Sequence, residues 1–428
     1  MGILNSTFSM KQLYHCKQVF LFLFCMVVFT PARAFSILAH EAIIDATWTS
    51  NIKPLLLKKY PSATAADLKQ AYAYTYGGSL VADMGYMPFG SPYFTNLLHY
   101  VRSGDFITTL IDEAETLDEY AFALGALSHY MADKYGHALA TNLAVAVDYP
   151  ELKKKFGDVV TYDDDHTSHS RIEFAFDVIQ TVKGNYAGAA YHNFIGFEIA
   201  TPVLQRAFGK VYGQNLNTVF PNFQSSIAHF RWGVRDLFPE LARVAWQSDK
   251  PGIAVSRKNV NGENYSSGMP KSDINAQHGP AYDKTGFIAK SLARIIEKLP
   301  KVGPLKKMGF KYPGVTCEEM FLQSMDSIVT NYNAALGKAG NNQLVLANID
   351  YDTGKPTALN EYALADATYN EWVTKLQVDK QAIIAPHLLQ NILAFYNKSV
   401  IPNLAVNQWG DKFKQPVVQD AMLGALGY

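Results

Sequence analysis

The segment from residue 117 to residue 139 constrains the fold most, because it reads as one long helix that also carries possible metal ligands. It opens with a T-x-x-E pattern, Thr116 and Glu119, whose side chains can accept hydrogen bonds from free backbone N–H groups at a helix start. Apolar side chains follow at helical spacing, namely Leu117, Tyr120, Leu124, Leu127 and Met131. The pattern predicts a helix with one face in a hydrophobic core.

Three polar side chains share one face of this predicted helix. His129, Asp133 and His137 follow one another at intervals of four residues. Burying two imidazoles and a carboxylate is costly unless a partner offsets the charge. A bound metal is the interpretation that we favour, and an exposed polar face with chance spacing is the alternative. Histidine and carboxylate ligands without cysteine indicate zinc or another divalent first-row ion.

Other candidate ligands lie on either side of this helix. His169 and Glu173 are again four residues apart, at the start of a predicted helix over 169–183, and His166 is a competing ligand three residues earlier. Asp83, His99 and His40 would be unremarkable alone and gain meaning from the other candidates. The remaining histidines have no acidic partner at ligand spacing and are interpreted as structural: His192, His229, His278 and His387.

The rest of the chain also favours helices, and alternating strand patterns are rare, so we expect an all-α protein. Further helices are predicted at 39–57, 64–75, 217–246, 317–336, 361–376 and 380–398, and near Phe287. Residues 247–284 are dense in Gly, Pro, Asn and Ser and are predicted to be a linker. With 428 residues, the chain suits two domains, placed at 35–246 and 285–428, the second without a readable role.

Residues 1–34 have the features of a secretory signal peptide. Lys11 and Lys17 precede an apolar run at 19–29, and an A-x-A cleavage pattern follows at 32–34. We expect cleavage after Ala34, which makes Phe35 the first mature residue and the protein secreted or periplasmic. An uncleaved membrane anchor is the alternative, but the apolar run is short for a span.

Charge and cysteine content exclude some classes of protein. The chain has 38 basic and 38 acidic residues, and removal of the leader takes Lys11, Lys17 and Arg33, leaving 35 against 38, or about −3. A nearly neutral chain gives no electrostatic reason to expect a stable nucleic-acid partner. Cys317 would be the only mature cysteine, so no intrachain disulfide is expected.

The ordered set of ligand candidates resembles a known superfamily. A free N-terminal residue, His40, Asp83, His99, an H-x-x-x-D-x-x-x-H motif and an H-x-x-x-E motif are similar to the trinuclear zinc proteins: bacterial phospholipases C, fungal single-strand nucleases and the catalytic domain of glycosylphosphatidylinositol phospholipase D. The resemblance covers about residues 35–176 and implies a helical fold with three zinc ions. The implied ligands are Asp83, His99, His129 and Asp133 for one ion, His137, His169 and Glu173 for a second, and Phe35, His40 and the shared Asp133 for a third.

The resemblance also implies an activity. It favours hydrolysis of phospholipids to diacylglycerol and a phosphorylated head group, with transient contact to a membrane surface and with Asp83 as the general base. Glu173 as the final acid is typical of the phospholipase branch, whereas the spacing from Phe35 to His40 is typical of the nuclease branch. A single-strand nuclease, or another phosphodiesterase, is therefore the alternative, and a zinc-binding surface protein without turnover is a further one.

Two departures from the pattern bear on the expected site. Phe35 stands where family members often begin with Trp, which is tolerable because backbone atoms would bind the ion. The residues that contact choline in the family do not map onto the segment from Asp83 to His99, so no head group is assigned.

Phe35 can supply an amine ligand only if cleavage exposes it, since an amine must be deprotonated and free to bind zinc. A protein with extra residues before Phe35 is therefore expected to lose one zinc ion and most of its activity. Metal analysis of matched preparations, with and without the extension, measures this. Full zinc content and activity in the extended protein would contradict the third ligand set.

Overall fold

The computed structural model describes residues 37–86, 89–183, 185–186, 197–245, 309–378 and 385–396. The predicted signal peptide, Phe35, the predicted linker at 247–284 and the helix expected near Phe287 lie outside these ranges. The described residues form helices and no β-strand, with one antiparallel bridge between Ile349 and Pro356. The all-α prediction is confirmed.

The elements follow one another along the chain in this order: α2 (Ile37–Thr47), η1 (Trp48–Ile52), α3 (Lys53–Lys59), α4 (Ala65–Ser79), η2 (Val81–Tyr86), α5 (Pro92–Tyr100), α6 (Ser103–Asp112), α7 (Leu117–Gly136), η3 (His137–Thr141), α8 (Asn142–Asp148), α9 (Pro150–Phe156), α10 (His166–Lys183), α12 (Thr201–Tyr212), α13 (Leu216–Val219), α14 (Phe223–Trp232), η5 (Gly233–Leu237), α15 (Phe238–Ala245), α19 (Val315–Ala339), α20 (Ala363–Val378) and α21 (Pro386–Phe395). Among the described helices, none has the length and apolar character needed to cross a bilayer.

Helix α7 is the central element of the fold. It contacts α4, α6 and α19, and its residues from Glu119 to Asp133 are all buried. A helix that is covered on every side must be mostly apolar, so polar ligands on it need a compensating partner. The N-terminal cap differs in part from the expected box. Thr116 accepts a hydrogen bond from the N–H of Glu119, as predicted, but the Glu119 carboxylate accepts from the N–H of Glu115.

Two of the predicted helices are shorter or more broken than the sequence pattern suggested. The segment 217–246 divides into α13, α14, η5 and α15, because Pro221 interrupts it and the side chain of Asn222 caps α14 by accepting from the N–H of Ser225. In the segment 380–398, the described helix begins only at Pro386, a favoured residue for a first helical turn.

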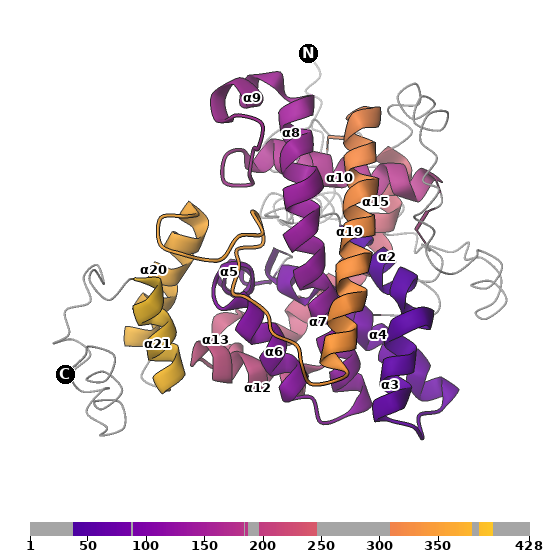
Figure 1. Cartoon of the computed structure of the whole chain (residues 1–428), viewed down its shortest axis with the longest axis vertical. Helices are drawn as coiled ribbons and strands as arrows, with labels where there is room; N and C mark the ends of the chain where they lie inside the picture. Colours follow the sequence, from indigo (N-terminus) through magenta and orange to yellow (C-terminus); the bar gives the residue numbers. More distant parts are fainter. Residues whose placement is uncertain are drawn as a thin grey trace, which may run out of the picture.

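The segment predicted as a C-terminal domain packs into the same core as the N-terminal helices. Figure 1 shows α19 running beside α7 and α8, and the hydroxyl of Tyr332 on α19 donates to the carbonyl of Leu124 on α7 at 2.8 Å. Trp372 on α20 donates to the carbonyl of Tyr212 at 2.9 Å. One continuous cluster of buried apolar side chains contains both parts. The described part of 285–428 therefore shares its core with the N-terminal helices, although a linker-like sequence precedes it.

Helices α4 and α7 approach each other closely through two glycines. A methyl group at Gly78 would lie 1.9 Å from the carbonyl oxygen of Phe122, and one at Gly125 would lie 2.0 Å from the carbonyl oxygen of Thr75. Backbone meets backbone at both points, so a side chain could be accommodated only if the helices moved apart. The contact also sets the position of Ser79, the last residue of α4.

The Gly78→Ala variant is expected to lower the free energy of unfolding by about 1–3 kcal/mol or more, because the added methyl group has no space. The matched control is Gly337→Ala in α19, where a Cβ would meet no atom within 4 Å. That change should raise stability by up to about 1 kcal/mol, since alanine favours the helix. Urea unfolding measures both, and a Gly78→Ala protein as stable as wild type would contradict the close contact.

Candidate metal centre

The structure brings all eight predicted side-chain ligands together. They come from α2, η2, α5, α7, η3 and α10, and each is buried. Three groups place one ligand atom per residue within 4.8 Å of one another: Asp83, His99 and His129; His40, His129 and Asp133; and His137, His169 and Glu173. Phe35, the ninth predicted ligand, lies outside the described residues, so its role stays a prediction.

Asp133 belongs to the group with His40 and His129 and also faces His99 of the neighbouring group. Its Oδ1 is 3.5 Å from Nε2 of His40, and its Oδ2 is 3.0 Å from Nε2 of His129 and 3.6 Å from Nε2 of His99. The two oxygens thus face different histidines. Asp83 completes this side of the site, with Oδ1 3.5 Å from Nε2 of His99.

The third group lies where α7 gives way to a wider helical turn. His137 is the first residue of the π-helical turn η3, and such turns are frequent at functional sites. Its Nε2 is 3.1 Å from Oε1 of Glu173, and Nε2 of His169 is 2.9 Å from the same oxygen. His169 and Glu173 are one turn apart on α10, as their spacing predicted.

Backbone carbonyl groups orient three of the histidines. Their Nδ1 atoms lie 2.8–2.9 Å from carbonyl oxygens: His99 from Thr95, His129 from Ser79 and His137 from Tyr351. A carbonyl oxygen can only accept, so each Nδ1 carries the proton and donates it. In the neutral ring, Nε2 is then left with the lone pair that a metal requires.

Several buried polar atoms of the ligand candidates have no hydrogen-bond partner, which supports a bound zinc ion at this site. Both oxygens of Asp83 and of Asp133, both ring nitrogens of His169 and the Nε2 atoms of His99 and His129 are buried without a hydrogen bond of normal geometry. Buried polar atoms are rarely left in this state, because each costs free energy. Imidazole and carboxylate ligands without thiolate suit zinc among the common metals. The donor set therefore fits the implied ions.

Charge interactions in the cluster shift the pKa values strongly in the metal-free protein. Burial alone would lower the pKa of His129, but Asp133 and Asp83 outweigh it and raise that pKa to about 9. Burial is likewise outweighed at His137, mainly by Asp133 and Glu173, and its pKa is about 10. Burial and the charge on His129 hold the pKa of His40 well below its usual value.

The two aspartates are shifted in opposite directions. For Asp133, burial raises the pKa, but the positive charges of His129 and His137 outweigh burial and hold it below the usual range. For Asp83, burial has the largest effect and raises the pKa, despite the nearby His129. The charges around Asp133 thus favour its anionic form, whereas burial favours the protonated form of Asp83.

The histidines interpreted as structural lie away from the three groups wherever the structure describes them. The ring of His229 contacts Phe89, with centroids 4.8 Å apart, and Nε2 of His387 is 3.1 Å from the carbonyl of Lys210. The competing candidate His166 packs against Tyr162, with centroids 4.1 Å apart, and belongs to none of the three groups. His192 and His278 fall outside the described residues.

Sequence reasoning missed two residues that border the centre, Tyr351 and Asp352. The Tyr351 ring lies 5.2 Å from that of His99, and Oδ1 of Asp352 is 3.9 Å from Nδ1 of His137. No metal-ligand spacing marks them, and they contact the centre from more than 200 positions away in the chain. Only the folded structure could reveal them.

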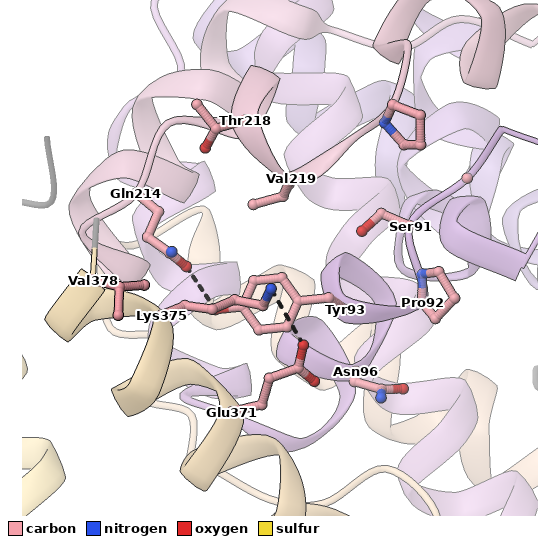
Figure 2. Close-up of a pocket in the computed structure, with 12 residues that line it drawn as sticks. Ser91, Pro92, Tyr93, Asn96, Gln214, Thr218, Val219, Glu371, Lys375 and Val378 are labelled. Atoms are coloured by element: carbon pink, nitrogen blue, oxygen red, sulfur yellow. Dashed lines mark hydrogen bonds and ion pairs between the residues drawn. The ribbon is translucent and has the colours of Figure 1, made fainter. Parts of the chain in front are cut away.

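A separate surface pocket of about 580 Å³ lies between the start of α5, the 214–221 region and α20. Figure 2 shows Lys375 above the ring of Tyr93, whose hydroxyl donates to Gln214. None of the eight metal-ligand candidates lines it. The pocket therefore does not define the metal centre, which rests on the buried ligand groups instead.

Comparison with known families agrees with this geometry. Residues 39–222 match the family described as zinc dependent phospholipase C, and this segment contains all eight side-chain candidates. The match supports the zinc-dependent phospholipase C family for this segment and a phospholipase C-type function in general, and that family implies a zinc-dependent phosphodiester hydrolase. Searches of curated proteins and of solved structures found no match.

Zinc binding should release protons. At pH 7.5, His129 and His137 are protonated in the metal-free protein, since their pKa values are about 9 and about 10. Zinc binds the neutral rings, so loading should release about two protons, and zinc affinity should fall as pH falls. Calorimetry in buffers with different ionisation enthalpies counts the protons. Release of none would contradict the placement of these two rings.

The raised pKa values of His129 and His137 predict that the stability of the metal-free protein falls as pH rises, whereas zinc affinity should rise with pH. Both histidines have folded pKa values above the unfolded value of about 6.5, so they stabilise the fold fully below about pH 6.5. That contribution should be lost as pH rises through 9 to 10. The Tm of chelated and of zinc-loaded protein should be measured across this pH range. The same change of Tm with pH in both forms would contradict the prediction.

Proposed function

We propose that this protein is an exported, zinc-dependent phospholipase C that hydrolyses phospholipids to diacylglycerol and a phosphorylated head group. The observation that carries the proposal is the set of three buried ligand groups, which lie within a segment of the zinc-dependent phospholipase C family. Three ions are proposed, one for each group, with the amine and carbonyl of Phe35 completing the group of His40 and Asp133.

When bound, zinc neutralises charge that develops on a phosphoryl group and lowers the pKa of water. The protein residues have distinct tasks around it. Asp133 is suited to hold two ligand groups together, because Oδ1 faces His40 while Oδ2 faces His99 and His129. Asp83 is suited to accept a proton, because its oxygens are buried without hydrogen bonds and burial raises its pKa.

Export and the lipid substrate rest on sequence features. The n-region, the short apolar run and the A-x-A pattern support cleavage after Ala34 and a secreted or periplasmic location. The near-neutral charge supports a lipid rather than a stable nucleic-acid partner. Contact with the membrane surface is expected to be transient.

A substrate panel tests the proposed activity. Mature, zinc-loaded protein should hydrolyse phospholipid micelles faster than single-stranded RNA, and a chelator should abolish the activity. Phosphatidylcholine, other phospholipids and RNA should be compared at equal protein concentration. Faster hydrolysis of RNA would assign the same metal centre to a nuclease, and no hydrolysis of any of them with zinc bound would leave a non-catalytic zinc protein.

Asp83→Asn separates catalysis from metal binding. Asparagine is nearly isosteric and keeps an oxygen ligand, but it does not act as a base, so kcat should fall by roughly 10²–10⁴ with zinc content mostly retained. Asp133→Ala should instead lose zinc and stability, since it removes the anion between three histidines. Lipid hydrolysis, metal analysis and thermal unfolding are measured on both. A wild-type rate in Asp83→Asn would exclude Asp83 as the base.

A further inference from the structure

The segment 347–355, here called the strap, crosses the metal centre from the C-terminal part of the chain. It lies outside the family match, and Figure 1 shows the extended chain between α19 and α20 passing α6 and α5. Ser103 fixes it from α6, since its Oγ donates to the carbonyl of Ile349 at 2.7 Å and accepts from the same residue's N–H at 3.0 Å. Tyr130 on α7 donates to the carbonyl of Ala347 at 2.9 Å.

The strap touches two of the metal-ligand candidates through its backbone. The carbonyl of Tyr351 accepts the Nδ1 proton of His137 at 2.8 Å. The N–H of Tyr351 donates to the carbonyl of His99 at 3.1 Å. Moving this one residue would therefore remove the partner that orients the His137 ring.

Asp352 fixes the position of this turn. Its Oδ2 accepts hydrogen bonds from the hydroxyl groups of Tyr100, at 2.8 Å, and Tyr362, at 2.6 Å. Its carbonyl accepts from the side-chain amide of Asn142 at 2.7 Å. The carboxylate is buried, and Tyr100 and Asn142 belong to α5 and α8, so two helices hold the turn.

Tyr362 connects the strap to the other half of the same ligand group. Its hydroxyl donates to Asp352 and also accepts the N–H of Asp163 at 3.1 Å. Asp163 lies just before α10, whose first turns carry His169 and Glu173. One hydroxyl thus joins the turn that orients His137 to the loop that leads into the other two ligands.

We propose that Asp352 and Tyr362 are positioning residues for the zinc site formed by His137, His169 and Glu173. The C-terminal part of the chain would then complete a metal centre whose eight side-chain ligand candidates all lie within residues 39–222. The inference rests on the proposed zinc site and is independent of whether lipid or nucleic acid is the substrate.

The test compares Tyr362→Phe with a matched control, Tyr369→Phe. Both changes remove one hydroxyl from a largely buried ring in the same part of the chain. The Tyr369 hydroxyl donates to Asn391 on α21 and accepts from the backbone of Arg102, and neither residue belongs to the strap or to the metal-ligand candidates. Stepwise zinc removal by a chelator of known affinity is followed in the full mature protein. Tyr362→Phe should weaken one ion about 10–100-fold and leave the others unchanged, the range typical when a partner of a metal ligand is lost. Tyr369→Phe should match wild type.

Three results would overturn the inference: the same zinc affinities in both variants, equal weakening of every ion in Tyr362→Phe, or weakening in step with a lower Tm of the metal-free protein. If Tyr362→Phe fails to fold, Asp352→Asn is the second variant. It keeps the size of the side chain and should weaken the same ion selectively. If the wild-type protein binds no zinc, both the proposed function and this inference are refuted. If the wild type binds zinc and Tyr362→Phe keeps the same zinc affinities, only this inference is refuted.

Discussion

The buried carboxylate of Asp133 among histidines is the constraint on which the rest of the structure depends. Removing one such charge from water costs several kcal/mol, and only close opposite charges or a metal can offset that cost. The fold meets this requirement by placing the ligand-bearing helix α7 at its centre, where five further elements bring histidines and carboxylates to it. The raised pKa values of His129 and His137 are the response of the same cluster when metal is not bound.

In this core, the packing of α4 against α7 determines how the His129 ring is oriented. Gly78 and Gly125 let α4 and α7 meet backbone to backbone. That contact brings the carbonyl of Ser79, at the end of α4, to 2.8 Å from Nδ1 of His129. The glycines therefore do more than avoid a clash, because the helix spacing that they permit decides which nitrogen of His129 faces the centre.

Local sequence patterns predicted which side chains come together, because each motif lies in one helix or in a helix and the turn that continues it. Spacings of four residues place His129 with Asp133, and His169 with Glu173, wherever a helix forms. No comparable sequence pattern marks Tyr351, whose contribution is a backbone carbonyl that any residue could provide. The Gly- and Pro-rich sequence before residue 285 suggested a domain boundary, but the apolar faces of α19 and α20 are buried against N-terminal helices. Long-range packing of this kind leaves no periodic pattern.

The metal centre draws its side-chain ligands and one of the groups that orient them from distant parts of the chain. All eight side-chain ligand candidates lie within residues 39–222, whereas the Nδ1 atom of His137 bonds to a strap carbonyl more than 200 positions away. A metal that binds only when the strap is docked also stabilises the docked strap, because binding energy is shared with any conformational change that it requires. If the proposed role of the strap holds, metal binding and the association of α19 and α20 with the N-terminal helices are thermodynamically linked. On this proposal the C-terminal part of the chain acts on the zinc site through the orientation of His137, without contributing a ligand to the three groups.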